Sequence, residues 1–104
     1  MKIYNKLVRD RIPEIIEASG KKAGIRIADN TEYRDLLRSK LAEEVKEYLE
    51  EDSPEELVDI VEVIRYLCVA HGISFDELLR SADKKKAEKG GFDRKIVLID
   101  VINE

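Results

Sequence analysis

The sequence predicts a mainly α fold: an antiparallel bundle of about four helices with a short C-terminal strand, in one domain spanning residues 1–104. Apolar residues make up 43% of the chain and recur at the three- and four-residue spacing of helices. Glycine and proline are scarce, at 5 and 2 residues, which disfavours a β-sandwich with its frequent turns. With 104 residues, two independent cores would be unusual.

The N-terminal third predicts one short helix followed by a connector. Pro13 suits the first turn of a helix, where its missing N–H costs nothing, and Gly20 is a helix stop. Residues 21–29 then form the connector, in which the alternating residues 24–27 are compatible with a short strand.

Two longer helices are predicted next, from about residue 32 to 50 and from residue 54 to just before Gly72. Asp29 and its neighbours are good N-caps for the first of them. Ser53 and Pro54 begin the second, with Glu56 placed to complete a capping box. The loop between the helices is only about three residues long, so they should pack antiparallel.

The C-terminal third predicts a helix and then a strand. Ser74 and Glu77 form a second capping box, and the helix should run to about Lys89, before two glycines. Residues 95–102 are apolar and β-branched, which is typical of a strand.

Composition narrows the class of protein. The longest apolar runs are four or five residues, far short of the ~20 that cross a bilayer, so we expect no membrane partner. No basic footprint for a nucleic-acid polymer is present. The single cysteine, Cys68, lies on an apolar stripe and should be a core residue; it cannot form an internal disulfide, which favours a cytoplasmic location.

Carboxylates are concentrated in residues 43–62, which hold ten acidic side chains and one lysine. Glu44 and Glu47 lie three apart near the end of one predicted helix, and Glu56 and Asp59 lie three apart at the start of the next. The short loop should place these two pairs opposite each other. Four such carboxylates repel unless a cation sits between them, and a hard divalent ion, Mg²⁺ or Mn²⁺, suits oxygen ligands best.

A simpler alternative remains open for the same residues. Charge-rich helices are common, and the acidic block is equally compatible with a solvated helix face. Glu56 then serves only as a capping-box residue, and Lys40 and Glu44 form an ordinary surface pair. On that interpretation the protein is a non-enzymatic helical interaction module, whose acidic face docks a basic partner.

The pattern E-E-x-x-E at residues 43–47, followed by E-x-x-D at residues 56–59, resembles the all-α NTP pyrophosphatase superfamily. Residues 4–13 (YNKLVRDRIP) and 89–92 (KGGF) are similar to the compact, stand-alone phosphoribosyl-ATP pyrophosphohydrolase-like members of this MazG-like group. The resemblance covers nearly the whole chain. One departure is the gap of eight residues between Glu47 and Glu56, which is shorter than in longer MazG-like proteins.

The resemblance implies a Mg²⁺-dependent hydrolase that cleaves a nucleoside triphosphate, or a phosphoribosyl-ATP-like substrate, to a monophosphate and pyrophosphate. It implies metal ligands at Glu44, Glu47, Glu56 and Asp59, with Glu43 as a base or as support for a ligand. The substrate phosphates also need cations from the protein. The candidates are Lys6, Arg9, Lys85 and Lys89.

A homodimer is expected as well. Val58, Val63 and Val69 lie around the third predicted helix, outside its main apolar stripe, so this helix should be covered on more than one side. A second copy of the chain would complete the bundle, in keeping with the superfamily.

Overall fold

A computed structural model describes residues 1–103 and contains four helices, α1 (Ile12–Ala18), α2 (Asn30–Glu51), α3 (Pro54–Ala70) and α4 (Phe75–Lys89). The mainly α prediction is confirmed. None of the helices in the described part of the chain has the length and apolar character that crossing a membrane requires.

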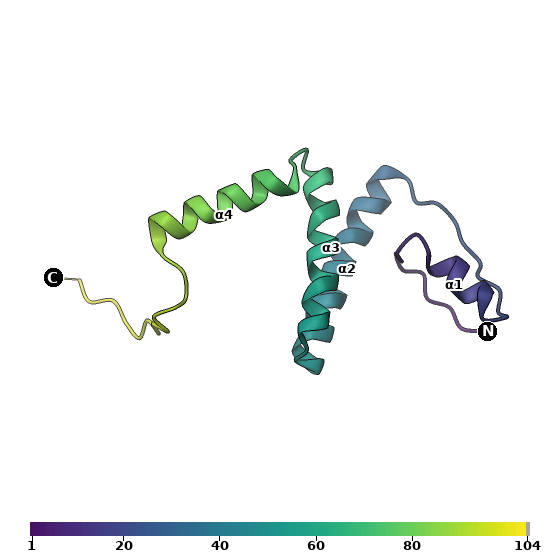
Figure 1. Cartoon of the computed structure of the whole chain (residues 1–104), viewed down its shortest axis with the longest axis horizontal. Coiled ribbons are helices and arrows are strands. Elements are labelled where there is room, and N and C mark those ends of the chain that lie inside the picture. Colours follow the sequence, from purple (N-terminus) through teal and green to yellow (C-terminus); the bar gives the residue numbers. More distant parts are fainter. Residues whose placement is uncertain (104) are drawn as a thin grey trace.

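Helices α2 and α3 form the packed centre of the molecule (Figure 1). Asp29 caps α2 by accepting a hydrogen bond from the Glu32 N–H, and Asp52 ends it in the left-handed conformation, with φ of 51°. Only two residues separate the helices, so they run antiparallel, as expected. Three apolar side chains are buried in this hairpin: Leu37, Val63 and Cys68. The prediction that Cys68 is a core residue is confirmed.

The capping box predicted for α4 is present, whereas the one predicted for α3 is formed only in part. At α4, the Ser74 hydroxyl accepts from the Glu77 N–H while the Glu77 carboxylate accepts from the Ser74 N–H, so the predicted capping box is present. At α3, Ser53 accepts instead from the Glu55 N–H. No capping-box hydrogen bond from Glu56 occurs within residues 1–103, which leaves its carboxylate free for other partners.

The four helices do not form a bundle within one chain. Helix α4 contacts α3 beyond the turn at Gly72 and then points away from the hairpin, and α1 lies close to no other helix of the described chain (Figure 1). The radius of gyration is 18.7 Å, compared with about 13 Å for a compact domain of this length. Of the predicted antiparallel bundle, the single chain therefore forms only the α2–α3 hairpin.

Neither predicted strand is present in residues 1–103, so the prediction of a C-terminal strand within the single chain is wrong. Residues 95–103 form no helix or strand, and Ile96 to Ile99 are each at least 71% exposed. The segment at 24–27 also pairs with nothing. A strand requires a neighbouring strand for its backbone hydrogen bonds, and one chain offers none to these segments.

Candidate metal centre

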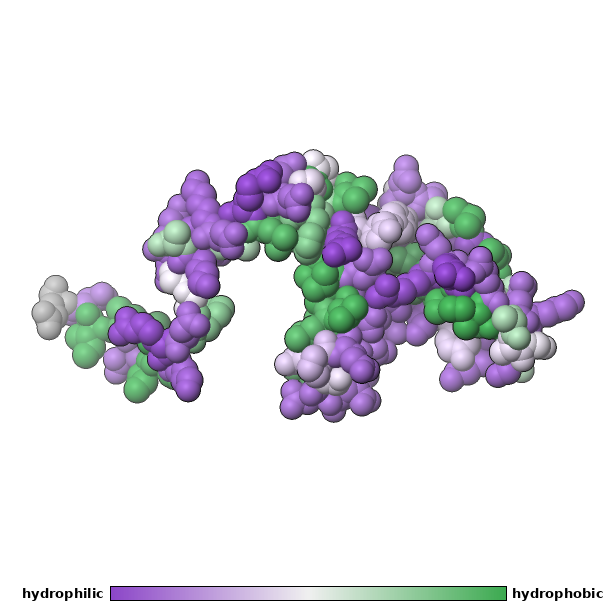
Figure 2. All heavy atoms as spheres, viewed as in Figure 1, coloured by the Kyte–Doolittle hydropathy of each residue, from purple (hydrophilic) through white to green (hydrophobic). Residues whose placement is uncertain are grey.

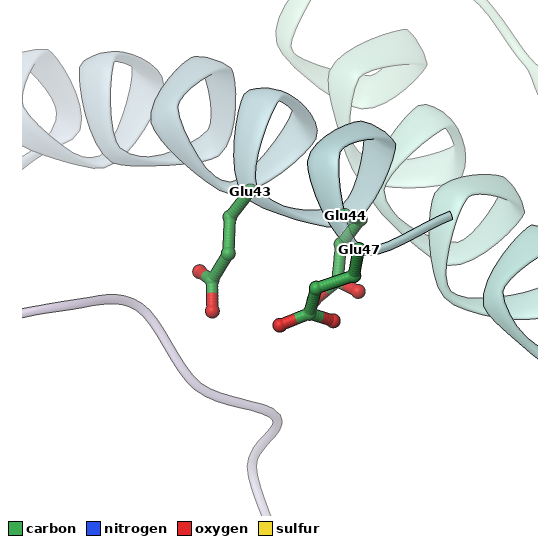
Figure 3. A group of neighbouring side chains, drawn as sticks. All are labelled: Glu43, Glu44 and Glu47. Atoms are coloured by element: carbon green, nitrogen blue, oxygen red, sulfur yellow. The ribbon is translucent and has the colours of Figure 1, made fainter. Parts of the chain in front are cut away.

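Five carboxylates converge where the second half of α2 faces the beginning of α3. One oxygen from each of Glu43, Glu44 and Glu47 lies within 4.8 Å of the others, and the same is true of Glu44, Glu56 and Asp59. Glu44 belongs to both groups and joins them. Figure 3 shows the three α2 carboxylates pointing to the same side of the helix, on which the N-terminal segment passes. We call these five residues the carboxylate cluster.

Glu44 is the most constrained member of the cluster. It is 6% exposed, and it is the only buried charged residue in the described chain. Lys40, one turn earlier, lies 3.2 Å from Glu44 Oε1, but Oε2 is buried without a hydrogen-bond partner. Burial raises the pKa of Glu44, and the neighbouring Glu47 raises it further, against the opposing effect of Lys40. A buried oxygen without a partner destabilises a protein, so its retention calls for a reason.

The pKa values of Glu56 and Glu43 are shifted in opposite directions. Desolvation and the negative charges of Asp59 and Glu44 raise the pKa of Glu56. Burial also acts to raise the pKa of Glu43, but hydrogen bonds and charge from Lys6 and Lys40 outweigh it and lower the pKa overall. Lys6 and Lys40 thus compensate the negative charge of Glu43, whereas the negative charges around Glu44 and Glu56 are compensated less.

The N-terminal segment supplies two cations to the cluster. Lys6 Nζ donates to Glu43 Oε1 at 2.7 Å, and this hydrogen bond raises the pKa of Lys6. The Arg9 guanidinium donates to Asp59 Oδ1 at 2.8 Å and lies 3.7 Å from Glu62. These pairs join residues 37 and 50 positions apart in the sequence, so they hold the N-terminal segment against the α2–α3 hairpin.

The other two predicted phosphate-binding residues lie elsewhere. Lys85 and Lys89 are exposed on α4, which contacts only α3 among the helices and projects away from the cluster (Figure 1). Within one chain the structure therefore brings Lys6 and Arg9 to the carboxylates and leaves Lys85 and Lys89 apart from them.

Two residues at the site were not assigned a role from the sequence. Lys40, which had been interpreted as half of an ordinary surface pair, has an 18% exposed side chain and touches both Glu43 and Glu44. Its spacing of three and four residues from these acids was the available signal. Glu62, three residues after Asp59, is the second acid near Arg9, and the same spacing marks it.

The residues present fit a hard divalent cation. All five potential ligands are carboxylates, which Mg²⁺ and Mn²⁺ favour. Glu44 belongs to both groups of carboxylates, and its buried Oε2 has no hydrogen-bond partner that would compete with a cation. Glu44, Glu47, Glu56 and Asp59 are the residues suited to hold the ion, and Glu43, already paired with Lys6, is suited to a supporting position.

Comparison with known proteins adds little to this geometry. No family model matches the chain, and no solved structure matches it. An uncharacterized protein of Mycolicibacterium smegmatis (strain ATCC 700084 / mc(2)155) is 56% identical over 41 residues, which are 39% of this chain. The match spans 42% of that relative, less than half its length. Fold and site together define an all-helical protein with an acidic, cation-compatible centre.

Proposed function

We propose that the protein is a Mg²⁺-dependent nucleotide pyrophosphohydrolase. Its substrate would be a nucleoside triphosphate or a phosphoribosyl-ATP-like nucleotide, cleaved to the monophosphate and pyrophosphate. The observation that carries the proposal is the buried Glu44, which belongs to both groups of carboxylates and has one oxygen without a hydrogen-bond partner. The sequence resemblance assigns the same residues to metal binding.

In this proposal each member of the cluster has a distinct task. Glu44, Glu47, Glu56 and Asp59 hold the ion, and Mn²⁺ would serve in place of Mg²⁺. A bound divalent ion supplies charge neutralisation at the phosphates and lowers the pKa of a bound water. Glu43 would orient the attacking water or accept a proton from it, because Lys6 holds the Glu43 carboxylate in the charged form near the other acids.

The N-terminal cations would exchange partners when substrate binds. Lys6 and Arg9 neutralise carboxylates in the ion-free protein, where their exposed pairs are weak. With a divalent ion held by the cluster, this neutralisation would no longer be needed, and the Lys6 and Arg9 side chains would be free to bind phosphate oxygens. Lys85 and Lys89 are further candidates for phosphate binding, and they require either a movement of α4 or a second copy of the chain.

The proposed enzyme is a homodimer in a reducing, cytoplasmic environment. The chain exposes 9676 Å², whereas a compact monomer of 12.0 kDa exposes roughly 6,000 Å² by size scaling. Burial of part of this excess against a second copy would give an interface of the size found in obligate dimers. The apolar residues 96–102 would then obtain the strand partner that the single chain lacks.

A second candidate is a non-enzymatic interaction module. The observation that favours it is the exposed acidic tip of the α2–α3 hairpin, which carries Glu50, Glu51, Asp52 and Glu55 outside the carboxylate cluster. A basic partner would dock on this tip by charge.

One experiment separates the two candidates. Pyrophosphate release is measured with Mg²⁺ over a panel of nucleoside triphosphates and phosphoribosyl-ATP. The enzyme proposal expects turnover that falls by about a hundredfold or more in Glu47→Gln and Asp59→Asn, because each removes one ligand charge. Glu51→Gln, at the acidic tip, is the matched control and should keep its activity. Absence of turnover over the whole panel would favour the interaction module.

A further inference from the structure

The side of α3 that faces away from α2 carries an exposed stripe. Val58, Glu62, Arg65 and Val69 follow one another at spacings of four, three and four residues, which places them on one face of the helix. Val58 is 64% exposed and Val69 is 70% exposed, whereas Val63, on the other side, is buried against α2. Of the three valines predicted to need a partner, two are therefore left uncovered by the single chain.

This face is hollowed and partly apolar. An open cavity of about 530 Å³ lies along it, lined by Arg9, Leu57, Val58, Val61, Glu62 and Arg65. Figure 2 shows hydrophobic side chains on α3 and on the adjoining side of α4, around the open space between these helices. A surface of this kind on a chain with excess exposed area indicates a protein partner.

The stripe is complementary to itself. Glu62 and Arg65 stand at its centre, and a valine lies four residues outward from each of them. If a second α3 runs antiparallel against it, Glu62 of each copy meets Arg65 of the other, and Val58 meets Val69. A two-fold interface needs this reciprocity, because the same surface must match itself. A parallel arrangement would instead place like charges together.

Neither central charge is fully satisfied within the chain. Arg65 lies over the Phe75 ring at 5.1 Å and has no carboxylate partner among residues 1–103. Glu62 approaches Arg9 only at 3.7 Å, since Arg9 donates its short hydrogen bond to Asp59. Both side chains are thus available to an approaching copy.

We infer that a second copy of this chain covers the exposed face of α3, with the two α3 helices antiparallel and reciprocal ion pairs between Glu62 and Arg65. The inference rests on the dimer in the proposed function and specifies its interface and register. Asp59 lies one turn from Glu62, so the interface adjoins the carboxylate cluster and encloses the cavity that Arg9 lines.

Reversed charges test this register. Glu62→Arg gives a chain with two arginines at the centre of the stripe, and Arg65→Glu gives a chain with two glutamates. Each variant alone should dimerise at least about tenfold more weakly, because like charges then face each other. An equimolar mixture should recover dimerisation to within about threefold of the unmodified protein, because the two variants complement each other. The dissociation constants are measured by sedimentation equilibrium.

The mixture controls for damage within one chain. Arg65→Glu also removes the contact with Phe75, and Glu62→Arg removes that with Arg9, but mixing cannot repair either loss. Glu17→Arg, an exposed glutamate on α1, is the matched charge control and should leave dimerisation unchanged. Orientation is tested in a Cys68→Ser background: Val58→Cys mixed with Val69→Cys should cross-link as a heterodimer, and Val58→Cys alone should not.

The possible contrary outcomes are distinct. A monomer for the unmodified protein would overturn both the dimer and this interface. If the charge reversals left dimerisation unchanged, or if the mixture failed to restore it, the protein would still be a dimer but the α3 pairing would be wrong. Such a result would assign the exposed stripe to another occupant, such as the partner copy's residues 96–102. None of these outcomes depends on catalytic activity.

Discussion

Residues 30–70 and residues 71–103 differ in how far they are packed, although both begin with well-capped helices. Within residues 1–103, the four buried residues all belong to α2 and α3, and none lies in α4 or the segment that follows it. The difference follows from composition: α3 is apolar on several sides, but nine of the fifteen residues of α4 are charged. Capping specifies where a helix begins, and apolar surface decides whether it packs.

The same contrast applies to electrostatics. In the α2–α3 hairpin, packing forces acidic residues together and buries one of them, Glu44. On α4, the lysines are solvated and exposed. The candidate site therefore lies where packing overrides the preference of charged side chains for water, and the charged side chains of α4 remain in water because no part of residues 1–103 packs over them.

The largest expected effect is a loss of stability on truncating a core leucine, and it tests whether α2 is packed more tightly than α4. Leu37 is 3% exposed in the hairpin, and Leu79 on α4 is 46% exposed. Leu37→Ala should lower the free energy of unfolding by about 2–5 kcal/mol, because it leaves a cavity in the core. Leu79→Ala should cost less than about 1 kcal/mol. Both are measured by urea unfolding at one fixed protein concentration; similar costs would mean that α4 is equally packed in the assembly.

The next effect concerns the metal. A ligand that binds only the folded state stabilises it by about 2.7 kcal/mol at a hundredfold excess over its Kd. Millimolar Mg²⁺ should therefore raise the melting temperature, measured by calorimetry. Glu44→Gln or Asp59→Asn should abolish this increase. The ion-free stability should rise slightly in Glu44→Gln, because one repelling charge is removed, but not in Asp59→Asn, which also loses the pair with Arg9. Glu17→Gln, an exposed residue on α1, should keep the increase. If Glu17→Gln and Asp59→Asn responded identically, the acidic block would be an ordinary solvated face.

Much of this centre could be predicted from the sequence because its residues are linked by short-range rules. The spacing of Glu44 and Glu47, and of Glu56 and Asp59, sets their helix faces, and the short loop brings the faces together. The position of Lys85 and Lys89 relative to the cluster depends instead on where α4 packs. Helix periodicity does not determine that, because it specifies which side of α4 is apolar and not the direction in which α4 leaves α3.

The C-terminal segment was predicted incorrectly for a related reason. Residues 95–102 have the β-branched composition of a strand, and composition reports only a local preference. Pairing is a long-range property, and the described chain provides no second strand. Lys95 even adopts the left-handed conformation, with φ of 58°, at the start of this segment.

A smaller effect should appear in the pH dependence of stability without metal. The pKa values of Glu44 and Glu56 are raised above 4.5 in the folded state, so the folded protein binds more protons than the unfolded chain just above that pH. Stability should therefore fall as the pH rises from about 4.5 through the raised pKa values. The lowered pKa of Glu43 acts in the opposite direction, below pH 4.5. Thermal melts from pH 4.5 to 7 should show a shallower fall in Glu44→Gln; an equally steep fall would contradict the assignment to Glu44.

The smallest effect is expected at the N-terminal segment. The Lys6–Glu43 pair is short but partly exposed, with 42% of the Lys6 side chain accessible, so solvent screens much of its energy. Lys6→Gln should lower the free energy of unfolding by no more than about 1 kcal/mol at low salt, and by less in 0.5 M NaCl. Lys22→Gln, in the exposed connector, is the control and should change stability at neither salt concentration. The same two variants should differ more in nucleotide binding than in stability, because Lys6 has a phosphate to bind only when substrate is present. Equal affinities of both variants for a nucleotide with Mg²⁺, measured by calorimetry, would mean that Lys6 only neutralises Glu43.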